Sequence, residues 1–124
     1  MLFDSRNKLG SCDPKLIEIV KALGLSHDFV VCCGHRSKEE QDQAFKSGNS
    51  KVKFPNSKHN SLPSRAVDLA PCSKDGKKID WNDIKAFKAL AQAFKEIAEA
   101  KGITIEWGGD WISFKDYPHF QIKE

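Results

Sequence analysis

The longest helical pattern in the sequence lies between residues 84 and 98, and it limits the folds that the chain can adopt. Apolar residues recur there every three or four positions, so a helix would carry them on one face. They are Ile84, Phe87, Leu90, Ala91, Phe94, Ile97 and Ala98. A helix with such a face is stable only when another layer of structure covers it. We expect Asp80 to cap this helix and Gly102 to end it.

Shorter patterns around this helix alternate between helix and strand. Helices are expected from Pro14 to Gly24 and from Ser37 to Lys46, the second beginning with a capping-box pattern. Strands are expected at residues 28–33, 65–70, 103–107 and 119–122, and a long polar loop at residues 48–64. This order predicts a single α+β domain over residues 1–124, with helices packed on one face of a small, mainly antiparallel sheet.

Composition and charge exclude several classes of protein. The 124 residues are 40% hydrophobic and carry a formal charge of +3, which permits binding to an anionic polymer but does not require it. No run of about 18 apolar residues predicts a membrane span, and the first residues lack the apolar stretch of a secretory signal. We therefore expect no membrane insertion and a location in the cytoplasm of the producing cell.

The sequence context argues against disulfides between the four cysteines. Cys12, Cys32, Cys33 and Cys72 form no C-x-x-C pair, so a cysteine zinc ribbon is poorly supported. A chain of this length can fold without disulfides, and no export signal is present. We expect most of these thiols to be buried as small hydrophobic side chains.

A carboxylate inside an apolar strand is the first candidate for chemistry. Asp68 lies in the segment Ala66–Ala70, where a charge is costly unless it is paired or binds a metal. His59 ends the polar loop and His119 lies on the last strand. Two imidazoles and one carboxylate suffice for a catalytic zinc with one open position. Taken singly, each residue is more simply explained as an exposed or ion-paired side chain, as we also expect for His27.

Two further polar residues could act beside such a metal. Asp116 precedes His119 by three residues, and a carboxylate there could accept a proton from water. Arg36 precedes a helix start and could clamp a carboxylate or a polarised carbonyl group. The simpler alternatives are a solvated turn for Asp116 and an ion pair with a glutamate of the next helix for Arg36. His35, directly before Arg36, allows either interpretation.

Four short motifs in this order resemble the zinc peptidases of family M15, with its VanY-like and phage endolysin branches. They are Gly34-His35-Arg36-Ser37, Ser57-Lys58-His59, Ala66-Val67-Asp68 and Asp116-Tyr117-Pro118-His119. The segments 79–83 and 107–111 also resemble the phage L-alanyl-D-glutamate endopeptidases. The resemblance covers residues 13–122, nearly the whole chain.

The resemblance implies a fold, a cofactor and a set of roles. His59, Asp68 and His119 would bind one zinc ion, and Asp116 would be the general base. Arg36 would orient the substrate or stabilise the tetrahedral oxyanion. The substrate would be the stem peptide of peptidoglycan, cleaved by a phage endolysin that acts on the wall after release. Substrate-binding candidates are Ser57, Trp107, Asp110 and Trp111, although the tryptophans and Asp110 could equally serve the core and a turn.

Two departures from the family pattern leave alternatives open. The segment between His59 and Asp68 holds about two extra residues, and the base is Asp116 where carboxypeptidase branches often carry glutamate. The aspartate favours the endopeptidase branch. The alternatives are a D-alanyl-D-alanine carboxypeptidase or dipeptidase, and a zinc-binding module that recognises the wall without catalysis. Nucleic acid is not expected as a partner, and we expect a monomer.

Overall fold

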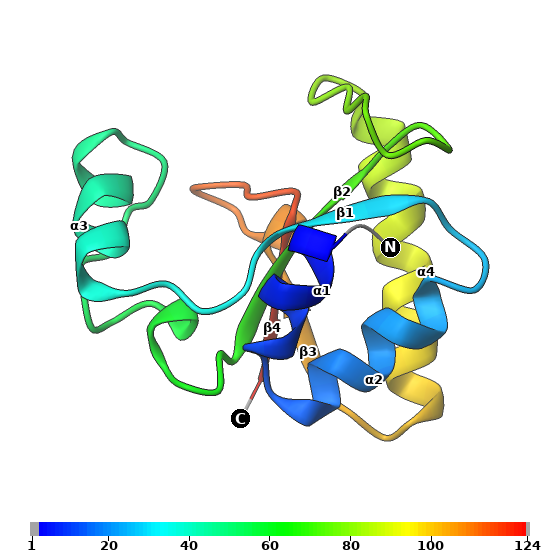
Figure 1. Cartoon of the computed structure of the whole chain (residues 1–124), viewed down its shortest axis with the longest axis horizontal. Helices are drawn as coiled ribbons and strands as arrows, with labels where there is room; N and C mark the ends of the chain where they lie inside the picture. Colours follow the sequence, from blue (N-terminus) through cyan, green and yellow to red (C-terminus); the bar gives the residue numbers. More distant parts are fainter. Residues whose placement is uncertain (1–2, 124) are drawn as a thin grey trace.

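The computed structural model describes residues 3–123, and their side chains from residue 7 onward (Figure 1). Four α-helices occur in this range: α1 (Phe3–Gly10), α2 (Pro14–Leu23), α3 (Lys38–Lys46) and α4 (Ile84–Ala100). The strands are β1 (Phe29–Cys33), β2 (Ala66–Pro71), β3 (Ile105–Trp107) and β4 (His119–Ile122). Two 3₁₀ turns, η1 (Lys58–Asn60) and η2 (Gly108–Asp110), complete the elements. No helix among the described residues is long and apolar enough to span a membrane.

The four strands form one antiparallel sheet in the order β1-β2-β4-β3. The sheet register places Asp68 of β2 opposite Cys33 on one side and His119 on the other. The β1–β2 ladder is irregular between Val31 and Cys33, as at a β-bulge. The predicted α+β class with an antiparallel sheet is confirmed.

The core lies between the sheet and the paired helices α2 and α4 (Figure 1). The apolar stripe of α4 faces the sheet, and Phe94 stacks on Phe120 of β4 with ring centroids 4.1 Å apart. Fully burying a side chain such as Phe94 contributes about 1.5–3 kcal/mol to folding. This packing fixes β2 and β4, the two strands that carry Asp68 and His119.

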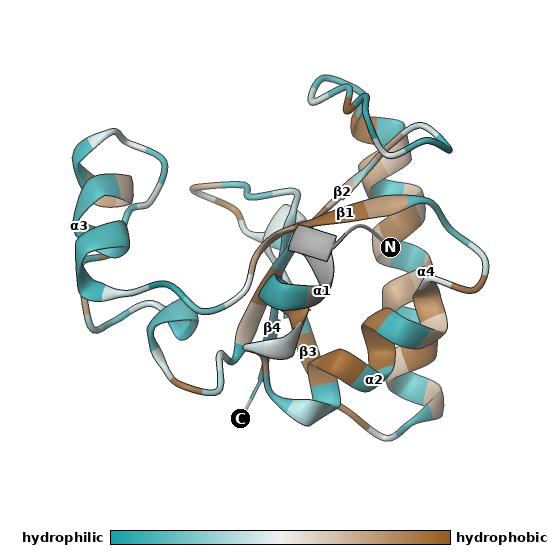
Figure 2. Cartoon of the chain, in the orientation of Figure 1, coloured by the Kyte–Doolittle hydropathy of each residue, from teal (hydrophilic) through white to brown (hydrophobic). Residues whose placement is uncertain are grey.

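Helix α3 lies apart from this core (Figure 1). Its capping box, formed by Ser37 and Glu40, is present as predicted, but the helix is mainly hydrophilic (Figure 2). Gln41 is the one buried residue described in it. The prediction that helices cover one face of the sheet therefore holds for α2 and α4 and not for α3.

Several element boundaries differ from the prediction. Asp83, not Asp80, caps α4, because its side chain accepts a hydrogen bond from the backbone N–H of Ala86 (3.2 Å). The Asp80 carboxylate instead accepts from the N–H of Asn82, in the turn before the helix. Helix α1 has a weak apolar pattern and was not predicted. The polar segment 48–64 contains the turn η1.

Candidate metal centre and active site

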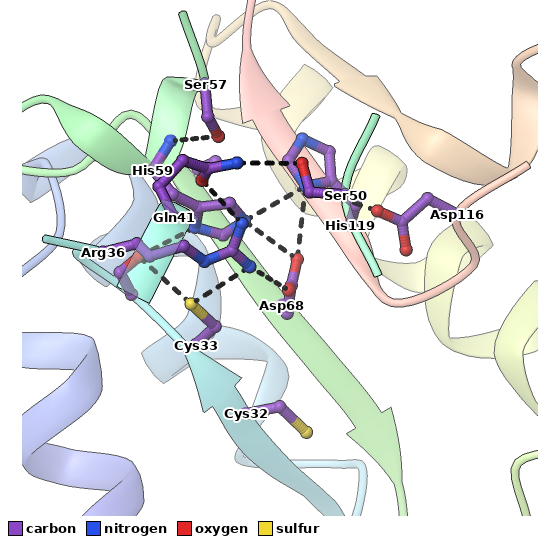
Figure 3. Close-up of polar contacts among 12 residues, drawn as sticks. Cys32, Cys33, Arg36, Gln41, Ser50, Ser57, His59, Asp68, Asp116 and His119 are labelled. Atoms are coloured by element: carbon purple, nitrogen blue, oxygen red, sulfur yellow. Dashed lines mark hydrogen bonds and ion pairs between the residues drawn. The ribbon is translucent and has the colours of Figure 1, made fainter. Parts of the chain in front are cut away.

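Three side chains from distant parts of the sequence meet beside the central strand β2 (Figure 3). Asp68 lies on β2, and the sheet register pairs it with His119 at the start of β4. His59 lies in η1, whose start is capped by the Ser57 hydroxyl accepting from the N–H of His59 (3.2 Å). The structure thus brings together the three residues predicted to bind a metal.

The potential ligand atoms of these residues form an equilateral triangle. His59 Nε2, Asp68 Oδ1 and His119 Nδ1 each lie 3.2 Å from the other two. A tetrahedral zinc ion with bonds of about 2.0–2.1 Å separates its nitrogen and oxygen ligands by roughly 3.3 Å. The triangle therefore fits one tetrahedral ion and leaves its fourth position for a water or a substrate oxygen.

Hydrogen bonds outside the triangle determine which nitrogen each histidine presents. His59 Nδ1 lies 2.7 Å from the backbone oxygen of Gly34, and His119 Nε2 lies 2.8 Å from Oε1 of Gln121. Both partners are acceptors, so these two nitrogens are the donors. His59 Nε2 and His119 Nδ1 are then the nitrogens available to a metal ion, as expected of histidine ligands held by outer hydrogen bonds.

The backbone around Gly34 positions the side chain of His59 and the start of the Arg36 side chain. A Cβ atom at Gly34 would overlap the backbone oxygen of Lys8 in α1, so only glycine lets the chain pass so close to that helix. The Gly34 carbonyl then reaches His59 Nδ1, and the backbone N–H of Arg36 donates to the His59 carbonyl (2.7 Å). These contacts explain why a Gly-x-Arg segment, Gly34 to Arg36, lies next to His59 in the site.

The electrostatics of the cluster favour a positive charge between the two rings. Burial would raise the pKa of Asp68, but the His59 and His119 rings outweigh it and hold that pKa well below its usual range. Burial would likewise lower the pKa of His59, but the Asp68 carboxylate, together with a smaller effect of Cys33, outweighs burial and raises that pKa to about 10. A proton and a metal ion would compete for the same donors.

Asp116 approaches this cluster from the loop before β4. Its Oδ2 lies 3.9 Å from His119 Nδ1 (Figure 3). Gly108 permits the approach, because a Cβ there would overlap the Asp116 backbone oxygen, and the Asp116 N–H donates to the Gly108 carbonyl (3.0 Å). Burial and the neighbouring Asp68 carboxylate raise the pKa of Asp116. The simpler alternative of a solvated turn does not describe this position.

Arg36 points toward the same cluster rather than to a glutamate of α3. Its side chain is 17% exposed, and Nη2 lies 3.9 Å from Asp68 Oδ2. Nη1 donates to Oε1 of Gln41 (2.9 Å), and Nη2 lies 3.7 Å from Cys33 Sγ. The Glu40 carboxylate is occupied with the Ser37 N–H in the capping box of α3.

A cleft of about 390 Å³ opens over the cluster. One wall comes from residues 49–58, and the other contains Trp111 and Phe114. Lys51 Nζ lies 5.3 Å from the Phe114 ring centroid, a cation–π contact between the two walls. Ser57 also lines the cleft, and the Trp111 ring lies 5.1 Å from the His119 ring.

Two of the predicted substrate-binding residues lie elsewhere. Trp107 is a core residue, 6% exposed, whose indole N–H donates to the Tyr117 carbonyl (2.7 Å). Asp110 forms an ion pair with Lys95 (2.6 Å), whose ammonium group also lies 5.2 Å from the Trp107 ring. Neither residue lines the cleft, so the core and turn alternative describes both. His27 lines a separate hollow of about 350 Å³ that also contains Cys72.

Three polar residues of the site were missed by sequence reasoning. Gln41 is fully buried and accepts from Arg36, and Cys33 Sγ belongs with His59 and Asp68 to a group whose potential ligand atoms lie within 4.8 Å. Gln121 accepts from His119. Strand alternation could have indicated Gln121, which lies two residues after His119 and therefore on the same face. No local pattern indicates Gln41 or Cys33.

The four cysteines form no disulfide in the structure, in line with the argument against disulfides from the sequence. Cys12 is buried, and burial raises its pKa to about 12. Cys32, Cys33 and Cys72 are only partly buried, which differs from the expectation that most would be enclosed.

Comparison with known proteins identifies relatives along the whole chain. The family model of the phage L-alanyl-D-glutamate peptidases matches residues 2–123. The chain is 36% identical over 122 residues to the L-alanyl-D-glutamate peptidase of Escherichia phage T5, covering 97% of this chain and 86% of that protein. It is also 36% identical over 103 residues to the peptidoglycan L-alanyl-D-glutamate endopeptidase CwlK of Bacillus subtilis, covering 77% of this chain and 60% of CwlK.

Solved structures show the same fold. The L-Ala D-Glu endopeptidase ChiX of Serratia marcescens superposes with a TM-score of 0.83 at 29% identity, covering 99% of this chain and 89% of ChiX. The vancomycin-resistance D,D-dipeptidase VanXYg has a TM-score of 0.52 at 23% identity, covering 87% of this chain and 47% of VanXYg, and supports the fold alone. The M15 resemblance is confirmed, and the chain belongs to the phage L-alanyl-D-glutamate peptidase family.

Proposed function

We propose that this protein is a zinc-dependent peptidase that cleaves the L-alanyl-D-glutamate bond of peptidoglycan stem peptides, in the role of a phage endolysin. The observation that carries the proposal is the triangle of donor atoms 3.2 Å apart, with Asp116 and Arg36 at the same cleft. The relatives named above for that bond support the choice of substrate.

The metal would be held by His59 Nε2, Asp68 Oδ1 and His119 Nδ1. A zinc ion bound there supplies Lewis-acid polarisation of a carbonyl group and lowers the pKa of a bound water. Cys33 offers a sulfur nearby, but the triangle without it leaves an open position, which a catalytic zinc site requires.

The protein's own residues supply proton transfer and orientation. Asp116 lies at the cleft with a raised pKa, so its carboxylate can take a proton from the attacking water and later return it to the leaving amine. Arg36 directs guanidinium N–H groups into the same space, where they can bind the substrate carbonyl as negative charge develops on its oxygen. Trp111 and Ser57 line the walls that would hold the peptide.

The test is mass spectrometry of fragments released from purified peptidoglycan, with and without a chelator. The proposal predicts a new free amine on D-glutamate that appears only without the chelator and returns when zinc is added back. Release of D-alanine instead would assign the carboxypeptidase or dipeptidase alternative. Bound zinc without any cleavage would support the non-catalytic wall-binding alternative.

A further inference from the structure

We propose that Gln121 is a positioning residue that holds His119 in the tautomer able to bind the metal, and that Glu106 orients Gln121. The inference rests on the metal centre of the proposed function. The contacts that carry it run from Glu106 Oε1 to Gln121 Nε2 (3.4 Å) and from Gln121 Oε1 to His119 Nε2 (2.8 Å).

The Glu106 carboxylate, at the outer end of this series of hydrogen bonds, fixes the direction of each hydrogen bond in the series. An ionised Glu106 can only accept, so the amide NH₂ of Gln121 faces it and the amide oxygen faces His119. That oxygen requires an N–H at His119 Nε2. The ring's lone pair therefore lies at Nδ1, the atom 3.2 Å from both Asp68 and His59.

The sheet register explains why these three residues meet. His119 and Gln121 are two residues apart on β4 and so project from the same face. Glu106 on β3 is the direct cross-strand partner of Gln121. Side chains directly opposite each other on neighbouring strands lie close enough to form a hydrogen bond.

The two histidines differ in how their tautomers are set. His59 is held by the Gly34 backbone carbonyl, which a side-chain substitution at that position does not remove. His119 depends on the Gln121 side chain, which is only partly buried and lines the cleft. A substitution of Gln121 therefore tests the orientation of a ligand with little disturbance of the core.

The experiment compares the zinc affinity of three variants by competition with a chromophoric chelator. Gln121→Met keeps the length of the side chain and removes the acceptor, and we expect about 10–100-fold weaker zinc binding. Gln121→Glu combined with Glu106→Gln keeps an acceptor at His119 Nε2 and avoids two facing carboxylates, and we expect affinity within about threefold of the wild type or tighter. Gln92→Met, on the exposed face of α4, is the matched control and should leave affinity unchanged.

A spectroscopic readout is independent of activity. Nitrogen-15 NMR of the zinc-loaded wild type should show His119 protonated at Nε2, and Gln121→Met should weaken protection of that proton from exchange. A wild-type His119 protonated at Nδ1 would overturn the inference, as would a Gln121→Met variant with unchanged zinc affinity.

The two proposals fail in distinguishable ways. If the wild type binds no zinc, the metal centre itself is wrong, and the role of Gln121 falls with it. If the wild type binds zinc and cleaves its substrate while Gln121→Met binds zinc equally well, the role of Gln121 alone is wrong.

Discussion

At the scale of single residues, Asp68 organises the site because one carboxylate serves three neighbours. Oδ1 lies 3.2 Å from a nitrogen of each histidine, and Oδ2 lies 3.9 Å from Arg36. A carboxylate in an otherwise apolar strand is tolerated where positive groups surround it. Asp116 and Arg36, which lie around this cluster, can therefore be tested separately from metal binding.

Replacing Asp116 by asparagine should abolish most turnover while zinc remains bound. The amide keeps the shape of the carboxylate but cannot accept the proton, and loss of a general base typically costs about 10²–10⁴-fold. The measurement is kcat on peptidoglycan fragments, together with zinc content by atomic absorption. Near-wild-type turnover would place the base elsewhere, and loss of zinc would indicate that Asp116 supports the metal site.

Replacing Arg36 by lysine should show whether activity needs only the positive charge at this position or also the geometry of the guanidinium group. Arg36 contacts Gln41 through one nitrogen and approaches Asp68 and Cys33 through the other, and a single ammonium group cannot replace both. We expect kcat/KM to fall by about 10²-fold, the scale for removing one donor to a developing oxyanion. A variant that keeps full activity but melts earlier would show that Arg36 serves only the structure.

At the scale of elements, one buried amide, that of Gln41, links α3 to the residues that line the cleft. Gln41 uses its full hydrogen-bonding capacity. Its Oε1 accepts from Arg36 Nη1 (2.9 Å) and Asn60 Nδ2 (3.3 Å), and its Nε2 donates to Ser50 Oγ (2.9 Å) and the Val52 carbonyl (2.6 Å). This single side chain links α3, the turn that carries His59 and one wall of the cleft.

Replacing Gln41 by methionine should destabilise this wall. The change keeps the side-chain length but leaves buried partners without hydrogen bonds, at about 1–3 kcal/mol for an unsatisfied group. We expect a lower melting temperature, faster proteolysis within residues 48–58 and a raised KM, with zinc content unchanged. Equal proteolysis of variant and wild type would show that the wall is held by other contacts. Gln43→Met, on the exposed surface of α3, is the matched control.

At the scale of the whole molecule, the buried cluster of His59, Asp68 and His119 makes the stability of the fold depend on pH. The folded protein raises the pKa of His59 from 6.5 to about 10. A raised pKa contributes stability that is fully present below the unfolded pKa and is lost as pH rises through the folded pKa. The chelator-treated protein should therefore lose stability between about pH 6.5 and pH 10.

Thermal unfolding at a series of pH values tests this link. The fall in melting temperature should be much smaller in the zinc-loaded protein, because metal binding replaces the proton on His59. In the chelator-treated protein, His59→Gln should reduce the fall in melting temperature at alkaline pH. An identical fall in wild type and His59→Gln would rule out His59 as its source.

Features that depend on local spacing could be predicted from the sequence. Helical periodicity predicted α4, the capping box predicted α3, and four ordered motifs predicted the family and the residues that meet at the cleft. The predictions of the helices succeed because the apolar spacing and the capping residues that form a helix lie within a few neighbouring residues. The cap of α4 was placed three residues early because Asp80 and Asp83 offer the same local chemistry.

The packing of the elements, in contrast, sets which of the remaining polar residues belong to the site. Gln41 joins Arg36 from α3, and Glu106 reaches Gln121 only through the pairing of β3 with β4. Asp110 and Trp107 carry suitable chemistry but are occupied by Lys95 and Tyr117. Hydrogen bonds and ion pairs act over a few ångströms, so partners are set by how the elements pack and not by their separation along the chain.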